Sequence, residues 1–299
     1  MPQNNFPKKY LFLFFLLTSF QLLSQEETHQ FVGTIQLEDK SLITYKIVFD
    51  EYEDGTIVGK SITDFSGAHR TESVIKGTLD RDEKKISFSE EANIATKSDY
   101  PDSTFCYVHL YDAKIKLKKR KSIIQGHFFG RYDDGSKCLE GDIYLINEKQ
   151  FFKKADKMTR RARFFVGKDK IAKAKEVVEN TRVGVGDMIL EEGDELIVHT
   201  PEDTIFLKVW DDEHVDGDKI SIHSNDQAFA ENINVIKEPR FISVPMTQDS
   251  IELDVFAINE GRIPPNSARL AVISGSQETP IKIKLNKDKK VNLLFVKAE

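Results

Sequence analysis

The chain has 299 residues, 39% of them hydrophobic and 31% charged, and its formal net charge is −6. Sixteen glycines and nine prolines are an ordinary complement, which excludes a disordered chain, and the hydrophobic content is enough for real cores. The length suits two domains of ordinary size.

The first 25 residues have the pattern of an export signal. Lys8 and Lys9 precede an apolar run from Tyr10 to Leu23, and polar sequence follows. The run is too short to span a bilayer comfortably, so a cleaved signal peptide over 1–25 is favoured over a membrane anchor. No cysteine near the cleavage region could carry a lipid. We therefore expect a periplasmic or secreted protein of a Gram-negative envelope, without a transmembrane segment in the mature chain.

Residues 26–147 carry eight runs with strand character and no helical period between them. Asp54-Gly55 and Asp134-Gly135 supply turn signals. The runs are 31–37, 42–49, 56–62, 72–79, 85–88, 105–117, 122–132 and 137–146. Eight antiparallel strands in up-and-down order can close into a barrel, which removes the sheet edges; an open sandwich is the alternative.

The runs Ile57–Ser61 and Gly77–Asp80 are similar to the meander of lipocalin- and avidin-like barrels. The glycine-tryptophan signature that opens a lipocalin is absent, because the only tryptophan is Trp210. The resemblance implies a lipocalin-like barrel over 26–147. Its interior is expected to be either a packed core or a cavity for a small apolar ligand.

The two cysteines, Cys106 and Cys138, lie near the starts of the sixth and eighth strands. Two cysteines in one domain of an exported protein favour a disulfide. Next-but-one strands are too far apart for a direct bridge unless a loop leans across. A disulfide and a pair of buried thiols therefore both stay open.

Residues 148–182 change character and are predicted to form a basic helical connector. Apolar side chains recur at helical spacing in two stripes, with Gly167 between them. The stripes are Phe151, Ala155, Met158, Ala162 and Phe165, and then Ile171, Ala174 and Val178, with an end at Asn180.

Within this connector, residues 149–175 hold eleven Lys or Arg and two acids, a charge of +9 that leaves −15 on the rest of the chain. Such a segment could bind an anionic surface such as lipid, lipopolysaccharide or acidic glycan, with nucleic acid less favoured. Alternatively, its apolar stripe packs on a sheet while Lys and Arg stay in water.

Strand patterns return over residues 183–299. The expected strands are 195–199, 204–210, 219–223, 241–244, 251–258, 269–274, 281–285 and 291–296. Their spacing and the intervening turn residues are typical of a β-sandwich. The predicted fold is thus all-β, with an eight-stranded barrel and a C-terminal β-sandwich joined by a basic helical connector.

Three motifs of this last region are Trp210-Asp211, Asp216-Gly217-Asp218 and the run Asn259–Ala268, which reads Asn-Glu-Gly-Arg-Ile-Pro-Pro-Asn-Ser-Ala. They resemble a C-terminal sandwich domain of exported Gram-negative bacterial proteins whose role is not established. One departure is Asn225-Asp226, where that family has Asn-Gly in a hairpin turn. The resemblance implies a fold and an extracytoplasmic location more than a function.

The acidic loop offers candidate ligands for Ca²⁺, which prefers several carboxylate and carbonyl oxygens. The candidate metal residues are Asp211, Asp212, Asp216 and Asp218, and the candidate binding residues beside them are Trp210, Asn259, Glu260 and Asn266. The spacing is not that of an EF-hand. The favoured alternative is a structural corner in which the carboxylates accept backbone N–H groups.

The sequence offers little support for catalysis. The seven histidines form no metal-binding pattern, and a simple hairpin register places His127 opposite Asp112 and His109 opposite Gly130. We predict no cofactor and a non-catalytic envelope protein that binds a partner protein or a small apolar ligand. A Ca²⁺-dependent carbohydrate-binding module is the alternative, and a barrel-based enzyme comes third.

Overall fold

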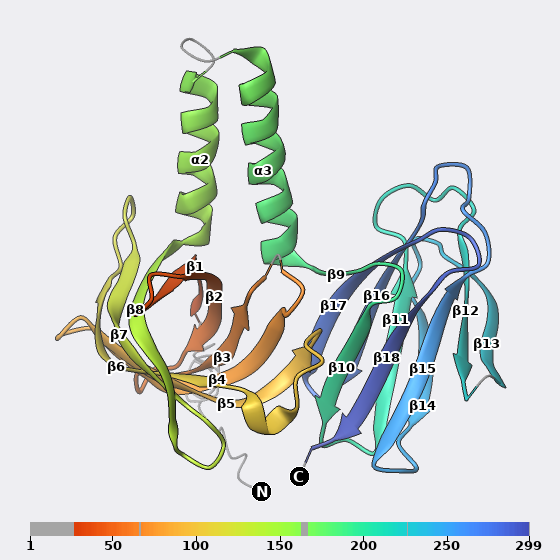
Figure 1. Ribbon diagram of the computed structural model, residues 1–299, viewed down its shortest axis with the longest axis horizontal. Coiled ribbons are helices and arrows are strands. Elements are labelled where there is room, and N and C mark those ends of the chain that lie inside the picture. The colour runs from red at the N-terminus through yellow and green to blue at the C-terminus, as the bar shows by residue number, and fades with distance from the viewer. Residues whose placement is uncertain (1–26, 66, 163–166, 226, 299) are drawn as a thin grey trace, which may run out of the picture.

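The computed structural model describes residues 27–65, 67–162, 167–225 and 227–298. It contains a closed eight-stranded barrel, two helices that project from it, and a two-sheet sandwich (Figure 1). The predicted fold class is confirmed. The predicted signal peptide, Phe165 and Asp226 lie outside the described residues. Within these residues, no helix has both the length and the apolar character needed to cross a membrane.

The barrel is an up-and-down meander in which each strand pairs antiparallel with the next. Pairing of the first strand with the eighth closes it, so the open-sandwich alternative is wrong. The strands are β1 (Glu27–Leu37), β2 (Leu42–Glu51), β3 (Thr56–Thr63), β4 (Thr71–Asp80), β5 (Lys85–Thr96), β6 (Tyr107–Lys116), β7 (Ile123–Arg131) and β8 (Lys137–Asn147), with a short 3-10 turn at Asp102–Thr104.

The barrel interior is a packed hydrophobic core. Side chains alternate along each strand, and eighteen inward-facing buried residues form one cluster that includes Phe31, Phe49, Phe88 and Phe128. Each of these four phenylalanines is at most 2% exposed. An eight-stranded barrel is narrow enough for its own side chains to fill.

Strand β5 is longer than the predicted run 85–88 because it pairs with β4 along its length, and its last two residues also have a partner outside the barrel. Ala95 and Thr96 pair with Val198 and Ile197 of β10 (Glu195–Thr200), and this contact joins the barrel to one sheet of the sandwich. Ile94 and Ala95 are buried in the core of the sandwich. The barrel and the sandwich therefore share one strand and part of one core.

The sandwich packs this extended sheet against a second sheet around the largest hydrophobic cluster. The first sheet continues in the order β10, β18 (Lys290–Lys297), β15 (Ser250–Ala257), β12 (Lys219–Ser224) and β13 (Gln227–Asn234). The second has the order β14 (Arg240–Pro245), β11 (Thr204–Trp210), β16 (Asn266–Ser274), β17 (Gln277–Leu285) and β9 (Met188–Leu190).

Cys106 and Cys138 form a disulfide with Cα atoms 6.0 Å apart, although β7 lies between β6 and β8. The intervening strand has a glycine, Gly130, at this point. A Cβ atom there would lie 2.4 Å from the Sγ atom of Cys106 and 2.9 Å from that of Cys138. The bridge thus crosses the middle strand where that strand has no side chain, so the disulfide prediction is confirmed.

The connector is a helical hairpin of α2 (Glu148–Ala162) and α3 (Lys168–Gly186). The predicted end at Asn180 is wrong. The helix continues because carbonyl groups of its last turn have cationic partners: Lys46 donates to the carbonyl of Val185, and Arg70 donates to that of Gly184. Cations at a helix C-terminus satisfy carbonyl groups and complement the helix dipole.

Candidate functional site

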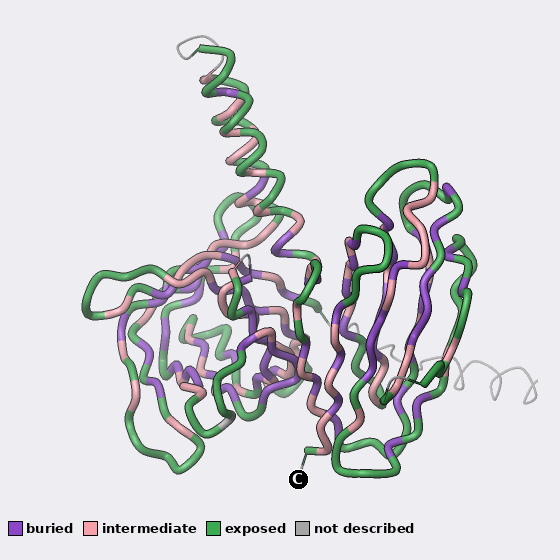
Figure 2. The backbone as a smooth tube through the Cα atoms, turned by 45° about the vertical axis from the view of Figure 1, so that its right-hand side comes forward, coloured by how far each residue is buried: buried purple, intermediate pink, exposed green. Residues whose placement is uncertain are grey.

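Only the base of the hairpin packs on the barrel. Phe152 and Val185 join Val32, Ile62 and Phe65 of the barrel in a small buried cluster. Above this base the helices rise side by side away from the barrel and the sandwich, and most of their residues are exposed (Figures 1 and 2). The alternative in which the apolar stripe packs on a sheet therefore applies only to the base.

The two helices hold each other through a few specific contacts. The Arg182 guanidinium lies 4.9 Å from the ring centroid of Phe152 and pairs with Asp156 at 3.0 Å. Ile171 is buried in α3, whereas Met158 of the predicted stripe is 63% exposed. The stripe prediction is thus wrong for Met158, because the buried seam of α2 includes Phe152 instead.

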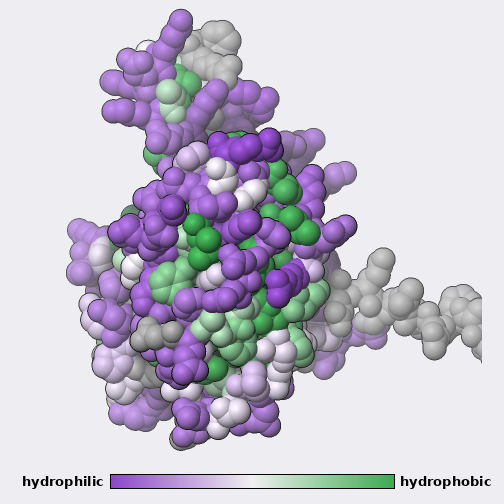
Figure 3. Space-filling view, turned by 90° about the vertical axis from the view of Figure 1, so that its right-hand side faces the viewer, coloured by the Kyte–Doolittle hydropathy of each residue, from purple (hydrophilic) through white to green (hydrophobic). Residues whose placement is uncertain are grey.

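The basic residues of the hairpin form one surface, which we call the hairpin surface. Ten of the eleven predicted Lys and Arg lie in the described part of the chain, and all ten are exposed (149, 153, 154, 157, 160, 161, 168, 170, 173 and 175). No carboxylate of the described residues forms an ion pair with them. In Figure 3 the visible part of the hairpin is mostly hydrophilic, with a few hydrophobic side chains among the polar ones.

A basic turn of the barrel extends the hairpin surface at its base. Residues 118–121 read Lys-Lys-Arg-Lys, join β6 to β7 and are all exposed. Gln150 at the start of α2 fixes this turn, since its side chain donates to the carbonyl of Lys118 and accepts from the backbone N–H of Ser122. The basic turn therefore lies next to the start of α2.

The motifs of the acidic loop and of Asn259–Ala268 bond to each other. Oδ2 of Asp216 accepts the N–H groups of Arg262 and Ile263 at 3.0 and 2.6 Å, and Oδ2 of Asp218 accepts that of Ser267 at 2.8 Å. Gly261 has a φ of +57°, and a Cβ atom on it would meet the Asp216 carboxylate at 2.4 Å. The geometry matches the structural corner favoured above.

Asparagines complete this corner. Asn259 accepts from the N–H of Lys219 and donates to the carbonyl of Gly217, while Asn266 donates to the carbonyls of Lys219 and Asn259. Glu260 accepts from the N–H of Lys287. These candidate binding residues are thus engaged with backbone.

The four candidate metal carboxylates have separate roles. Asp211 accepts the N–H of Glu213, and Asp212 pairs with Arg269. Within the described residues, these aspartates form no group of three whose ligand atoms lie within 4.8 Å of one another. Trp210 is half-buried beneath the Lys208 ammonium, 4.8 Å from the ring centroid, so it is not an open stacking platform.

Asp218 is electrostatically unusual. It is 2% exposed, and its Oδ1 atom has no hydrogen-bond partner among the described residues. The pKa of Asp218 is raised to about 6: burial is the main cause, the bond from Ser267 opposes it, and the charges of Asp216 and Asp211 add to the rise. Oδ1 of Asp216 and Oδ1 of Asn266 are likewise buried without a partner in the described structure.

A shallow hollow of about 600 Å³ lies on the outer face of β6, β7 and β8. The exposed aromatic rings of Tyr111, Phe129 and Tyr144 line it. His127 at its edge pairs with Asp142 of β8 at 3.1 Å. The predicted register is correct at Lys114–Lys116 but is shifted by one residue at Tyr107–Leu110, because β6 bulges between Leu110 and Lys114, so His109 faces Phe129 instead of Gly130.

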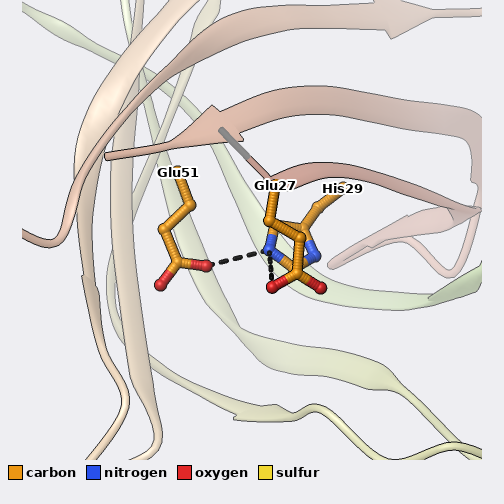
Figure 4. Close-up of side chains that lie close together, drawn as sticks. All are labelled: Glu27, His29 and Glu51. Atoms are coloured by element: carbon orange, nitrogen blue, oxygen red, sulfur yellow. Dashed lines mark hydrogen bonds and ion pairs between the residues drawn. The ribbon is translucent and has the colours of Figure 1, made fainter. Parts of the chain in front are cut away.

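Two further sites were not predicted from the sequence. Glu90 inside the barrel accepts from the hydroxyls of Tyr45 and Ser61 and from the N–H of Val108, and burial raises its pKa. At one end of the barrel, Glu27, His29 and Glu51 converge (Figure 4). The sequence could have indicated the group of Glu27, His29 and Glu51 only if the register between β1 and β2 had been known.

Comparisons with known proteins leave the family open, since no protein-family model, curated protein or solved structure matches the chain.

Proposed function

We propose that this chain is an exported, non-catalytic binding protein of the cell envelope that holds an acidic partner protein on its hairpin surface. The observation that carries the proposal is a projecting helical hairpin with ten exposed cationic side chains that have no carboxylate partners within the described structure. Unpaired like charges on one hairpin repel one another. An acidic partner would relieve that repulsion and complement the surface.

The barrel interior supports a partner protein over a small apolar ligand. Its inward-facing side chains pack against one another as a single cluster. An apolar ligand would have to displace packed side chains, and overpacking such a core typically costs about 1–3 kcal/mol. The barrel then serves as the platform that anchors the hairpin.

Export is supported by the Cys106–Cys138 disulfide, since disulfides persist in oxidising compartments. The signal-like residues 1–25 lead us to propose a mature chain that starts near Gln25. Mass spectrometry of the protein recovered from the periplasm or medium tests this, and an intact Met1 there would refute it.

We also propose that residues 183–299 belong to the sandwich domain they resemble. The motifs that carry the resemblance form one hydrogen-bonded corner through Asp216 and Asp218. This contact gives a physical reason for the two motifs to occur together.

Charge reversal tests the hairpin surface. Lys153, Lys154 and Lys157 are changed to Glu, and a matched control reverses the exposed Lys237 and Arg240 of the sandwich with Lys40 of the barrel. Sedimentation with envelopes of the source bacterium, at several salt concentrations, measures binding. The hairpin variant should bind at least about tenfold more weakly, a change of ~1.4 kcal/mol.

The control variant should stay within about twofold of wild type, because scattered surface charges contribute little. Equal losses in both variants would refute a specific hairpin surface. Binding that survives protease treatment of the envelopes would replace the partner protein with an anionic lipid or glycan surface.

Carbohydrate binding is a second candidate, supported by the hollow on the outer face of β6–β8. Aromatic rings with polar groups at their edges are typical of small-ligand sites. Affinity electrophoresis in polysaccharide gels compares Tyr111→Ala and Tyr144→Ala with Phe241→Ala, a control at an exposed aromatic of the sandwich. Retardation lost only in the tyrosine variants, with or without Ca²⁺, would favour this function.

A further inference from the structure

Three potential metal ligands meet at one end of the barrel. Glu27 and His29 are two residues apart on β1 and so lie on the same face of the strand, and Glu27 is the cross-strand partner of Glu51 on β2. Nε2 of His29 lies 2.9 Å from Oε2 of Glu51 and 3.9 Å from Oε2 of Glu27. Figure 4 shows both carboxylates turned toward the same imidazole nitrogen.

We propose that Glu27, His29 and Glu51 bind one divalent transition-metal cation of the Zn²⁺ class. One imidazole nitrogen and two carboxylates suit this class, and each donor atom lies about 2.0–2.2 Å from the metal. Two atoms bound to one ion at that range can be at most about 4.4 Å apart. The two distances from His29 therefore fit, with small movements of the carboxylates.

The guanidinium group of Arg81, in the turn after β4, lies where a metal ion bound to the two carboxylates would lie. Its Nη2 atom donates to Oε2 of Glu27 at 2.8 Å and to Oε2 of Glu51 at 2.6 Å, and its Nε atom donates to the other Glu51 oxygen. The guanidinium thus contacts the same two oxygens that face His29. Its presence shows that positive charge is stable there.

Burial and exposure favour exchange of Arg81 for a metal. His29 and Glu51 have side chains only 8% and 9% exposed, so the binding atoms are already positioned. The Arg81 side chain is 53% exposed and has room to swing into water. A divalent ion would neutralise both carboxylates, whereas Arg81 neutralises one, so metal and arginine compete for one place.

Zinc titration of the whole exported chain tests the proposal. A cleavable tag at the C-terminus keeps Glu27 free of added ligands, and the protein is treated with EDTA and dialysed before calorimetry at pH 7.5. We expect one Zn²⁺ per chain, and a visible absorption band when Co²⁺ replaces it. His29→Ala and the near-isosteric Glu51→Gln should each weaken binding by more than about tenfold.

Arg81→Ala separates a metal site from an ion-pair network. Because Arg81 competes with the metal, its removal should tighten Zn²⁺ binding by about tenfold. The metal-free variant lacks the charge-assisted hydrogen bonds from Arg81 that the metal must otherwise displace. The matched control is His127→Ala, which breaks another histidine–carboxylate pair on the barrel and should leave binding unchanged.

The same experiments can overturn the proposal. Failure of both wild type and Arg81→Ala to bind Zn²⁺ up to 1 mM would mean that the four residues are only an ion-pair network. Equal affinity in wild type and Arg81→Ala would refute the exchange. Glu51→Gln retains the side-chain shape, so its melting temperature shows whether any loss of binding reflects unfolding. None of these outcomes depends on the hairpin surface.

Discussion

Replacing Asp218 with asparagine should remove a pH dependence of stability from the sandwich. The carboxyl is 2% exposed, accepts one backbone N–H, and has a pKa of about 6 in the folded chain. The usual pKa of an aspartate, about 3.8, applies to the unfolded chain. The folded protein therefore binds the proton more tightly than the unfolded chain does.

The direction of the pH dependence of stability follows from this difference between the folded and unfolded pKa of Asp218. A raised pKa contributes stability that is fully present below about pH 4 and is lost as pH rises through about 6. Between pH 7 and pH 5, a shift from about 3.8 to about 6 contributes about 1.3 kcal/mol, which solvent screening reduces to about 1 kcal/mol. The asparagine side chain of the variant does not titrate, so the variant gains nothing from acidification at this position.

Urea unfolding followed by tryptophan fluorescence measures this effect. Trp210 is the only tryptophan and stands directly before the acidic loop, so its signal reports on this corner. The stability of wild type minus that of Asp218→Asn should rise by about 1 kcal/mol from pH 7 to pH 5. Other titrating groups cancel in this difference. A constant difference would refute the raised pKa, and one that falls on acidification would show a lowered pKa, as a bound cation would produce.

Three further predictions concern the corner, the disulfide and the shared sheet. Asp216→Asn should destabilise the sandwich by about 1 kcal/mol or more, because two charge-assisted bonds to backbone N–H groups weaken. Millimolar Ca²⁺ should leave the melting temperature of wild type unchanged; a melting temperature that rises with Ca²⁺ in wild type but not in the variant would favour a metal site. Gly130→Ala should destabilise the barrel by about 1–3 kcal/mol, since the added methyl group overlaps the disulfide. The control Gly186→Ala should not destabilise it, because a Cβ atom at Gly186 meets no atom within 4 Å; similar urea midpoints for the two variants would contradict this. Proteolysis within the hairpin should give two fragments that co-elute in gel filtration because β5 pairs with β10; separate elution without denaturant would show that the shared sheet does not hold them.

The strand pattern predicted the barrel because buried and exposed residues alternate along much of it, as in β8 and the first half of β5. The same logic missed β13, whose residues are mostly exposed, and β9, which has only three residues. Both lie at sheet edges, where burial does not impose a pattern. Periodicity is therefore informative only where a strand has a buried face.

The candidate sites depended on contacts between distant residues. Sequence alone proposed both arms of the corner, because Asp216, Asp218 and the Asn259–Ala268 run are unusual locally. It could not show that Arg81 meets Glu27 across 54 positions. It also missed the bulge in β6 between Leu110 and Lys114, which shifts the register of Tyr107–Leu110 by one residue, because the position of the turn alone does not show where an extra residue is inserted.

The strand shared by barrel and sandwich has an evolutionary consequence. Recombination within the hairpin would pair one barrel with a foreign sandwich and would have to recreate the β5–β10 match, so the two parts are expected to be inherited together. The hairpin is different, because it leaves the body after β8 and returns at β9. Insertions or deletions of whole turns in α2 and α3 would leave the shared sheet intact, so hairpin length is the feature most free to diverge between lineages.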